Sequence, residues 1–250
     1  MKKILLIAGM LLIMHRGLRS QVINIESYRI RTDTSGWAGS ADVSLYLAKY
    51  DEPILTFLTN LQLQYKEGKS LFLMLTDLAS VQTDEEKFVS SGFQHFRYNY
   101  KITDRFVWEA FVQGQYNAPL AIDWRFLTGT GPRFKLVGTD KFRMYIAALY
   151  MFELEKNTGI EDPINANRLS SYISFTLETN ENYTLTSTTY YQPNFADFAD
   201  YRISTALNLK TYFGKYGYMK LKYSLLDDKA PAEGVPETTY NLSGGLGFEF

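Results

Sequence analysis

The stretch that decides the fold is the last one, Tyr240-Asn-Leu-Ser-Gly-Gly-Leu-Gly-Phe-Glu-Phe250. Its apolar residues share one parity: Tyr240, Leu242, Leu246, Phe248 and Phe250. The polar residues Asn241, Ser243 and Glu249 take the other parity. Because successive side chains of a β-strand point to opposite faces, this segment has one apolar and one polar face. It is therefore predicted to be an amphipathic strand.

The same alternation recurs along the chain in about twelve segments, each followed by a turn signal. It is clear in residues 55–65, 93–101, 143–155, 202–213 and 217–225. Alternation of this kind also fits an antiparallel sheet with one face in water, so a soluble β-sandwich stays an alternative at this point.

The connections between these segments favour a membrane barrel, because they alternate in length. Short turns are predicted at 67–69, 103–104, 138–140, 179–182 and 214–215, and longer loops at 82–86, 117–123, 157–167, 193–200 and 227–238. Only the first connection, 50–53, is short where a long one is expected. An up-and-down barrel places short turns on the periplasmic side and long loops outside. We therefore predict an all-β fold, an up-and-down antiparallel transmembrane β-barrel of about twelve strands.

Lipid explains why the strands must close into a ring. It offers no hydrogen bonds to the backbone, and each unsatisfied group costs several kcal/mol. About twelve strands spaced ~4.8 Å apart and tilted near 40° give a backbone diameter on the order of 24 Å. Pro132 interrupts one of the strand-like segments, and a bulge or local kink is expected there.

The N-terminus predicts export from the cytoplasm. Lys2 and Lys3 precede a short apolar run, Ile4 to Met14, and a cleavage site is expected after Ser20. The run is shorter than the ~18 residues of a membrane-spanning helix, although an uncleaved anchor is the alternative. We assign residues 1–20 to a signal peptide, 21–35 to an N-terminal periplasmic segment and 36–250 to the barrel. Val22 to Thr34 could form an extra strand, a lumenal plug or a tail, and we favour the tail.

Composition narrows the class further. Cysteine is absent, so no disulfide framework holds the fold. A formal net charge of -1 gives no support for a nucleic-acid partner. Aromatic residues reach 16%, which two belts at the membrane–water interfaces would explain. No transmembrane helix is expected after the signal peptide.

Two segments, Gly36-Trp-Ala-Gly-Ser-Ala-Asp-Val-Ser-Leu45 and Gly129-Thr-Gly-Pro-Arg-Phe-Lys-Leu136, together with Phe250, resemble the salt-induced outer-membrane protein family. The resemblance covers roughly Gly36 to the end. It implies an outer-membrane location and a link to osmotic or salt stress, and it supplies no functional residue. The final aromatic also resembles the C-termini of outer-membrane barrels, which implies that the barrel-assembly machinery reads Phe250. Outer-membrane lipid is the other expected partner.

Catalytic and metal chemistry find little support in the sequence. His95 is the single histidine after the predicted cleavage site, and a lipid hydrolase would need a nucleophile beside it. Its neighbour of the same parity is Arg97, and no His-x-Ser spacing exists. Glu161 with Asp162, and Asp84 to Glu86, lack the spacing of a calcium loop. We predict no enzyme, no cofactor and no metal.

Function is expected to be spread over the lumenal face. Parity predicts these lumen-facing residues: His95, Arg97, Lys101, Glu109, Gln113, Arg125, Arg133, Lys135, Arg143, Glu153, Glu155, Arg202, Lys210, Lys220, Lys222 and Glu249. Basic residues outnumber acidic ones, which in a wet pore would favour anions. The charges could equally pair across a filled interior. Three functions follow: a narrow passive channel for small hydrophilic solutes or ions, which we favour; a non-conducting structural envelope protein; and, more remotely, a barrel-embedded lipid hydrolase.

Overall fold

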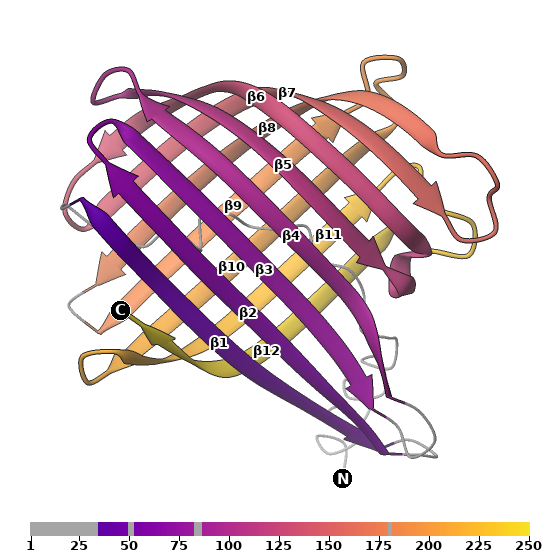
Figure 1. Cartoon of the computed structure of the whole chain (residues 1–250), viewed down its shortest axis with the longest axis horizontal. Coiled ribbons are helices and arrows are strands. Elements are labelled where there is room, and N and C mark those ends of the chain that lie inside the picture. The colour runs from indigo at the N-terminus through magenta and orange to yellow at the C-terminus, as the bar shows by residue number, and fades with distance from the viewer. Residues whose placement is uncertain (1–34, 50–52, 83–86, 180–181) are drawn as a thin grey trace, which may run out of the picture.

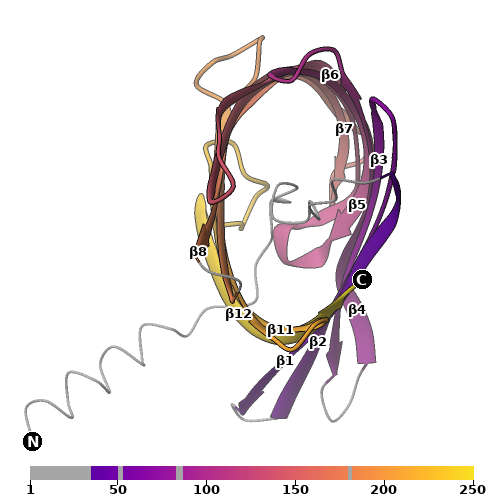
Figure 2. The same cartoon turned by 90° about the vertical axis from the view of Figure 1, so that its left-hand side faces the viewer.

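A computed structural model describes residues 35–49, 53–82, 87–179 and 182–250 as one closed antiparallel barrel, in which each strand pairs with its neighbours in sequence (Figure 1). The strands are β1 (Gly36–Lys49), β2 (Pro53–Glu67), β3 (Ser70–Gln82), β4 (Lys87–Lys101), β5 (Phe106–Asn117), β6 (Ile122–Gly138), β7 (Phe142–Asn157), β8 (Ile164–Thr179), β9 (Tyr183–Pro193), β10 (Tyr201–Phe213), β11 (Gly217–Asp228) and β12 (Thr238–Glu249). β12 returns to pair with β1, so the ring is complete, as the end-on view shows (Figure 2). The predicted twelve-stranded up-and-down barrel is confirmed. The predicted signal peptide and Val22 to Thr34 lie outside the described residues.

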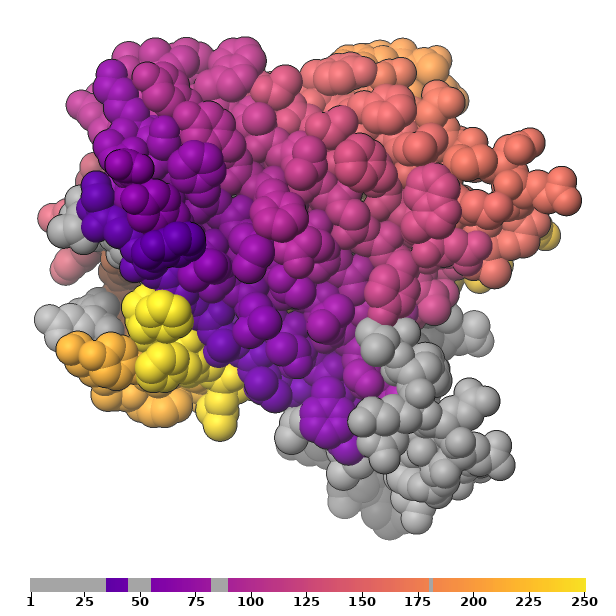
Figure 3. Space-filling model, in the orientation of Figure 1, coloured from indigo at the N-terminus to yellow at the C-terminus, as the bar shows by residue number. Residues whose placement is uncertain are grey.

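The two faces of each strand differ as the alternation predicts. On β11, Met219 and Leu221 are exposed on the outside of the ring, whereas Lys220 and Lys222 are buried inside it. Leu246 of β12 and Phe250, which follows that strand, are likewise exposed outside. Large apolar side chains cover the outer surface, part of which Figure 3 shows over β1 to β7. An exterior this apolar around a polar interior suits a lipid environment and not water.

The connections divide the barrel into two ends, which we call the short-turn end and the long-loop end. The short-turn end holds the turns after β2, β4, β6, β8 and β10, together with the start of β1 and the end of β12. At the long-loop end, the 3-10 helix η2 (Ala118–Leu120) follows β5, and Asn117 caps it by accepting a hydrogen bond from the Leu120 amide. The loops before β6 and β8 are shorter than predicted, because those strands begin already at Ile122 and Ile164. The described part of the chain contains no helix that could span a bilayer.

The predicted bulge at Pro132 is wrong. β6 keeps one register with β7 on both sides of it, from Thr130↔Tyr150 to Arg133↔Ala147, and Pro132 itself pairs with Trp108 of β5. The register shifts of β6 against β7 lie elsewhere, at Ile122/Trp124 and Lys135/Val137. Proline lacks an amide proton, so it removes a single ladder hydrogen bond, and here the strand continues without an inserted residue.

The seam between β1 and β12 closes the ring with a short ladder. It runs from Ser40↔Glu249 to Ser44↔Gly245, and Gly39 and Phe250 exchange backbone hydrogen bonds of 3.1 and 3.0 Å beyond it. In Figure 3 the yellow C-terminal residues lie directly against the indigo first strand. A ladder this short depends on close packing of the side chains around it.

Glycine makes that close packing possible. Gly247 faces the interior, and a Cβ there would collide with the Asp42 carboxylate and the Tyr218 ring. Tyr218 is fully buried against this position. Gly244, by contrast, faces outward, and the nearest atom to its Cβ would be 3.8 Å away.

We predict that Gly247→Val opens the seam, whereas Gly244→Val does not. The first substitution must displace Tyr218 or Asp42, and overpacking of this kind costs about 1–3 kcal/mol. The measurement is the urea concentration that unfolds the protein refolded into detergent micelles or lipid vesicles. Equal midpoints for the two variants would contradict the assigned orientation of β12.

Candidate functional site

At the short-turn end the interior of the barrel opens into a cavity of about 500 Å³. We call this cavity the basic cup. Seven cationic side chains line it against four anionic ones: Lys66, Lys69, Lys101, Arg133, Lys135, Arg143 and Lys210 with Asp104, Asp140, Glu178 and Glu249. The whole chain carries 26 Lys and Arg against 27 Asp and Glu, so the cup concentrates positive charge that the rest of the molecule lacks.

Ion pairs form within the basic cup. Lys101 contacts Asp104 at 2.7 Å, Lys210 contacts Glu249 at 2.9 Å, and Arg143 pairs with Glu178. The hydrogen bond from Lys101 holds the pKa of Asp104, which lies in an exposed turn, below its ordinary value. These pairs cancel one charge each, and the surplus of cations over carboxylates in the cup remains.

Between the basic cup and the long-loop end, apolar side chains fill one side of the interior. This inner apolar cluster consists of Phe111, Ala147, Leu149, Met151, Tyr172 and Tyr190. The Phe111 ring lies against Gly129, where any Cβ would overlap it. Glycine at 129 therefore gives the ring its place inside the barrel, and the cluster narrows the lumen from β5 to β9.

A buried polar cluster borders the inner apolar cluster. Glu109 accepts hydrogen bonds of 2.9 Å from both Arg97 and Tyr172, and the Nε atom of Arg133 lies 3.7 Å from it. His95 is fully buried, with its Nδ1 2.8 Å from the Gln113 side-chain oxygen and its ring stacked on Phe111. These contacts hold the histidine in the barrel wall.

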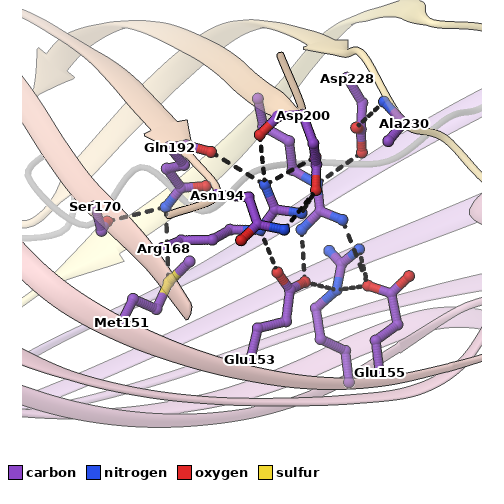
Figure 4. Close-up of polar contacts among 12 residues, drawn as sticks. Met151, Glu153, Glu155, Arg168, Ser170, Gln192, Asn194, Asp200, Asp228 and Ala230 are labelled. Atoms are coloured by element: carbon purple, nitrogen blue, oxygen red, sulfur yellow. Dashed lines mark hydrogen bonds and ion pairs between the residues drawn. The ribbon is translucent and has the colours of Figure 1, made fainter. Parts of the chain in front are cut away.

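Nearer the long-loop end, ion pairs cross the lumen. We call this set the arginine network: Arg125, Glu153, Glu155, Arg168, Asp200, Arg202 and Asp228. Figure 4 shows Glu153 and Glu155 of β7 pointing toward Asp200 and Asp228 on the opposite side, with guanidinium groups between them. The network thus joins β6, β7, β8, β10 and β11.

Glu153 is the centre of the arginine network. Its carboxylate lies 2.9 Å from Arg125, 2.7 Å from Arg168 and 2.5 Å from Arg202, and its side chain is only 3% exposed. Arg202 also contacts Asp228 at 2.7 Å. Buried ion pairs need such multiple hydrogen bonds to offset the loss of water around each charge. The network is therefore rigid only as a complete set.

The loop after β11 narrows the long-loop end further. Val235 packs on Leu120, Ile122 and Leu226, which form a small apolar cluster. The Ala230 amide donates to the carboxylate of Asp228, which ties this loop to the arginine network.

The remaining side of the interior is polar and incompletely hydrogen-bonded. We call it the polar wall: Thr56, Asn60 and Gln62 of β2, Ser204 and Asn208 of β10, Ser224 of β11, and Thr239 and Asn241 of β12. Each has at least one buried side-chain oxygen or nitrogen without a hydrogen-bond partner in the described part of the chain. Buried polar atoms in folded proteins are almost always paired, with protein or with water. The polar wall extends from Asn208, which lines the basic cup, to Thr239 near the long-loop end.

The structure distributes the sequence-predicted residues over these parts. Lys101, Arg133, Lys135, Arg143, Lys210 and Glu249 line the basic cup. His95, Arg97, Glu109 and Gln113 form the buried cluster beside Phe111, and Arg125, Glu153, Glu155 and Arg202 belong to the arginine network. Lys220 pairs with Asp42 at 2.7 Å, and Lys222 is buried on the same strand. Lys101 differs from the others, because its side chain is half exposed at the rim of the cup.

The apolar part of the interior was not predicted from the sequence. Phe111 has the same parity as Glu109 and Gln113, and Leu149 and Met151 have the same parity as Glu153, so the signal was present. Arg168 was not predicted either, nor were the carboxylates of Asp42, Asp200 and Asp228, which pair with several of the lumenal cations. Of the acidic loop residues, Glu161 and Asp162 are exposed at the long-loop end, and Asp84 to Glu86 lie outside the described residues.

Known structures share this fold. The chain is similar to the COG4313 outer membrane channel from Pseudomonas putida F1, with a TM-score of 0.55 and 10% identity over 92% of this chain and 100% of that one. It is also similar to the NanC porin, with a TM-score of 0.52 and 12% identity over 85% of this chain and 98% of that one. At such identities the likeness shows the fold alone.

Sequence comparison identifies the family. No curated protein matches the chain. The family model described as "Protein of unknown function, DUF481" matches residues 54–250, from the second strand to the last residue. The chain therefore belongs to the DUF481 family.

Proposed function

We propose that this protein is a narrow passive channel in the outer membrane, which conducts ions and small hydrophilic solutes and prefers anions. The apolar exterior of the closed ring is the surface that lipid requires. Two proteins of the same fold are described as an outer membrane channel and a porin, which agrees with this proposal.

The observation that carries the proposal is the continuity of the polar wall with the basic cup. Asn208 belongs to both, and unpaired polar atoms follow from it along β10, β11 and β12 toward the opposite end. These buried atoms find no partner among the described residues, so water molecules along the polar wall would satisfy them, and a row of water molecules through the barrel would be a path for ions. The cation surplus of the cup gives this path its anion preference.

The rest of the interior sets the width of the path. The inner apolar cluster fills the side of β5 to β9, and the arginine network crosses the lumen from β6 to β11. The pore is therefore narrow, and large solutes are excluded.

The expected partners follow from the surface. Lipid covers the apolar exterior. Phe250 is 61% exposed at the outer edge of the seam, where the barrel-assembly machinery can reach a terminal aromatic ring.

A second candidate is a structural envelope protein that conducts nothing. The arginine network favours it, because complete ion pairing across a lumen closes the lumen and stiffens the wall. The link to salt or osmotic stress, which the sequence resemblance implies, belongs with this candidate. A lipid hydrolase is the remote alternative, and the packing of His95 between Gln113 and Phe111 does not favour it.

Conductance separates the first two candidates. We expect purified protein in a planar bilayer to give discrete single-channel currents, and a KCl gradient to give a reversal potential of the sign that chloride selectivity requires. A protein that stays silent at every salt concentration and voltage would exclude the channel and leave the structural role.

The inner apolar cluster supplies a matched test of the path. Phe111→Ala removes a ring from the lumen and should raise the single-channel conductance. Phe96→Ala removes an outward-facing ring from the adjacent strand β4 and should leave conductance unchanged. If the two variants conduct equally, the ions do not pass beside Phe111.

The arginine network supplies a test of stability. Glu153→Gln leaves three guanidinium groups without their shared carboxylate, and breaking a buried charge set typically costs about 3–5 kcal/mol. Glu161→Gln removes an exposed carboxylate from a loop at the same end and is the control. We expect a lower urea midpoint for Glu153→Gln alone, together with larger or more frequent channel openings. Wild-type stability in Glu153→Gln would show that the network does not hold this end together.

A further inference from the structure

The basic cup has features of a binding site and not only of a charged entrance. Its volume of about 500 Å³ falls within the range of small-molecule pockets. Cations lie on opposite sides of it: Lys66 near the end of β2 and Lys69 in the turn after it on one side, and Lys135 and Arg143 of β6 and β7 on the other. A ligand in the cup would therefore meet positive charge from two directions.

Two side chains in the cup, Asn208 and Arg143, have buried polar atoms that make no hydrogen bond to the described residues. Asn208 is only 3% exposed, and neither its amide nitrogen nor its amide oxygen is hydrogen-bonded within the described part of the chain. Arg143 pairs with Glu178 through Nη2, whereas its buried Nη1 makes no hydrogen bond to any described residue. Buried groups of this kind cost free energy unless something binds to them, so both favour a polar ligand.

The charge balance identifies the class of that ligand. Three carboxylates are engaged by Lys101, Lys210 and Arg143, yet the lining as a whole keeps three more cations than carboxylates. One chloride ion would balance only one of these three charges. A molecule that carries two or more negative groups can reach both sides of the cup, and guanidinium and ammonium groups bind carboxylate and phosphate oxygens with charge-assisted hydrogen bonds.

We propose that the basic cup binds a small organic anion with two or more carboxylate or phosphate groups, held between Lys135 and Arg143 on one side and Lys66 and Lys69 on the other, with Asn208 contacting its polar part. This inference rests on the proposed channel and names the class of solute that the channel would accept. The cup would then be the selective step, because a low-dielectric wall around the cations strengthens their attraction for such an anion.

Calorimetric titration of the full chain, refolded in detergent micelles, tests the inference. The probes are citrate and pyrophosphate, with acetate and glucose as the singly charged and neutral comparisons. We expect heat of binding from citrate, pyrophosphate or both, and the stronger of the two assigns the site to carboxylates or to phosphates. The affinity should fall steeply between low and high salt. Equal responses to acetate and citrate, or no response to either polyanion, would overturn the proposal.

Paired variants locate the binding. Lys135→Gln with Arg143→Gln should weaken citrate or pyrophosphate binding roughly tenfold or more, since two charge-assisted contacts are lost. Lys141→Gln with Lys215→Gln removes the same charge at the same end from exposed turns outside the cup, and should change binding little. Equal loss in both pairs would mean attraction to the general charge of this end, which contradicts a site in the cup. Urea midpoints of both pairs establish that each is folded.

The same preparations distinguish this proposal from the proposed function. A protein that conducts in the bilayer but binds neither polyanion would be a channel without this site. A protein that binds a polyanion in the cup but never conducts would retain the site and lose the channel.

Discussion

The structure depends on one constraint: a backbone that lies in lipid must find all of its hydrogen bonds within itself. Consecutive strands satisfy it by pairing with their neighbours, and the last strand satisfies it by returning to the first. The seam from Ser40↔Glu249 to Ser44↔Gly245 is therefore the contact on which the ring depends. Position 247 faces inward there, and only glycine leaves room for Tyr218 and Asp42 at this close approach.

Closure also creates an interior that must be filled by side chains or by water. In this barrel, side chains fill part of the interior and polar groups line the rest. Apolar rings fill one side, ion pairs centred on Glu153 cross toward the long-loop end, and unpaired polar atoms extend along β2, β10, β11 and β12. Charge is nearly balanced in the arginine network and unbalanced in the basic cup. The arginine network therefore joins the strands of the barrel, whereas the excess of cations in the basic cup can attract an anionic ligand.

The fold could be predicted from the sequence because alternation is a local property. Each of the segments around Leu63, Tyr98 and Met219 carries its own period of two, and the alternating lengths of the connections then fix the topology. The pairing of charges could not be predicted, because it depends on contacts between strands far apart in sequence. Lys220 meets Asp42 across the seam, and Arg202 meets Glu153 from three strands away. A count of lumenal cations therefore overstated the positive charge, because Asp42, Asp200 and Asp228 pair with several of these cations. The inward position of Phe111 was not predicted, because Glu109 and Gln113 on the same face of β5 indicated a polar, hydrated face.

The central claim is that the apolar face of every strand touches lipid while the other face looks into the lumen. The chain contains no cysteine, so a single spin label can be placed at each of Asn241, Leu242, Ser243 and Leu246 of β12 in lipid vesicles. Relaxation by oxygen, which concentrates in lipid, is compared with relaxation by a water-soluble nickel complex. The account predicts strong oxygen relaxation at Leu242 and Leu246 and weak oxygen relaxation at Asn241 and Ser243. Oxygen relaxation that does not alternate along β12, or that peaks at Asn241 and Ser243, would contradict it.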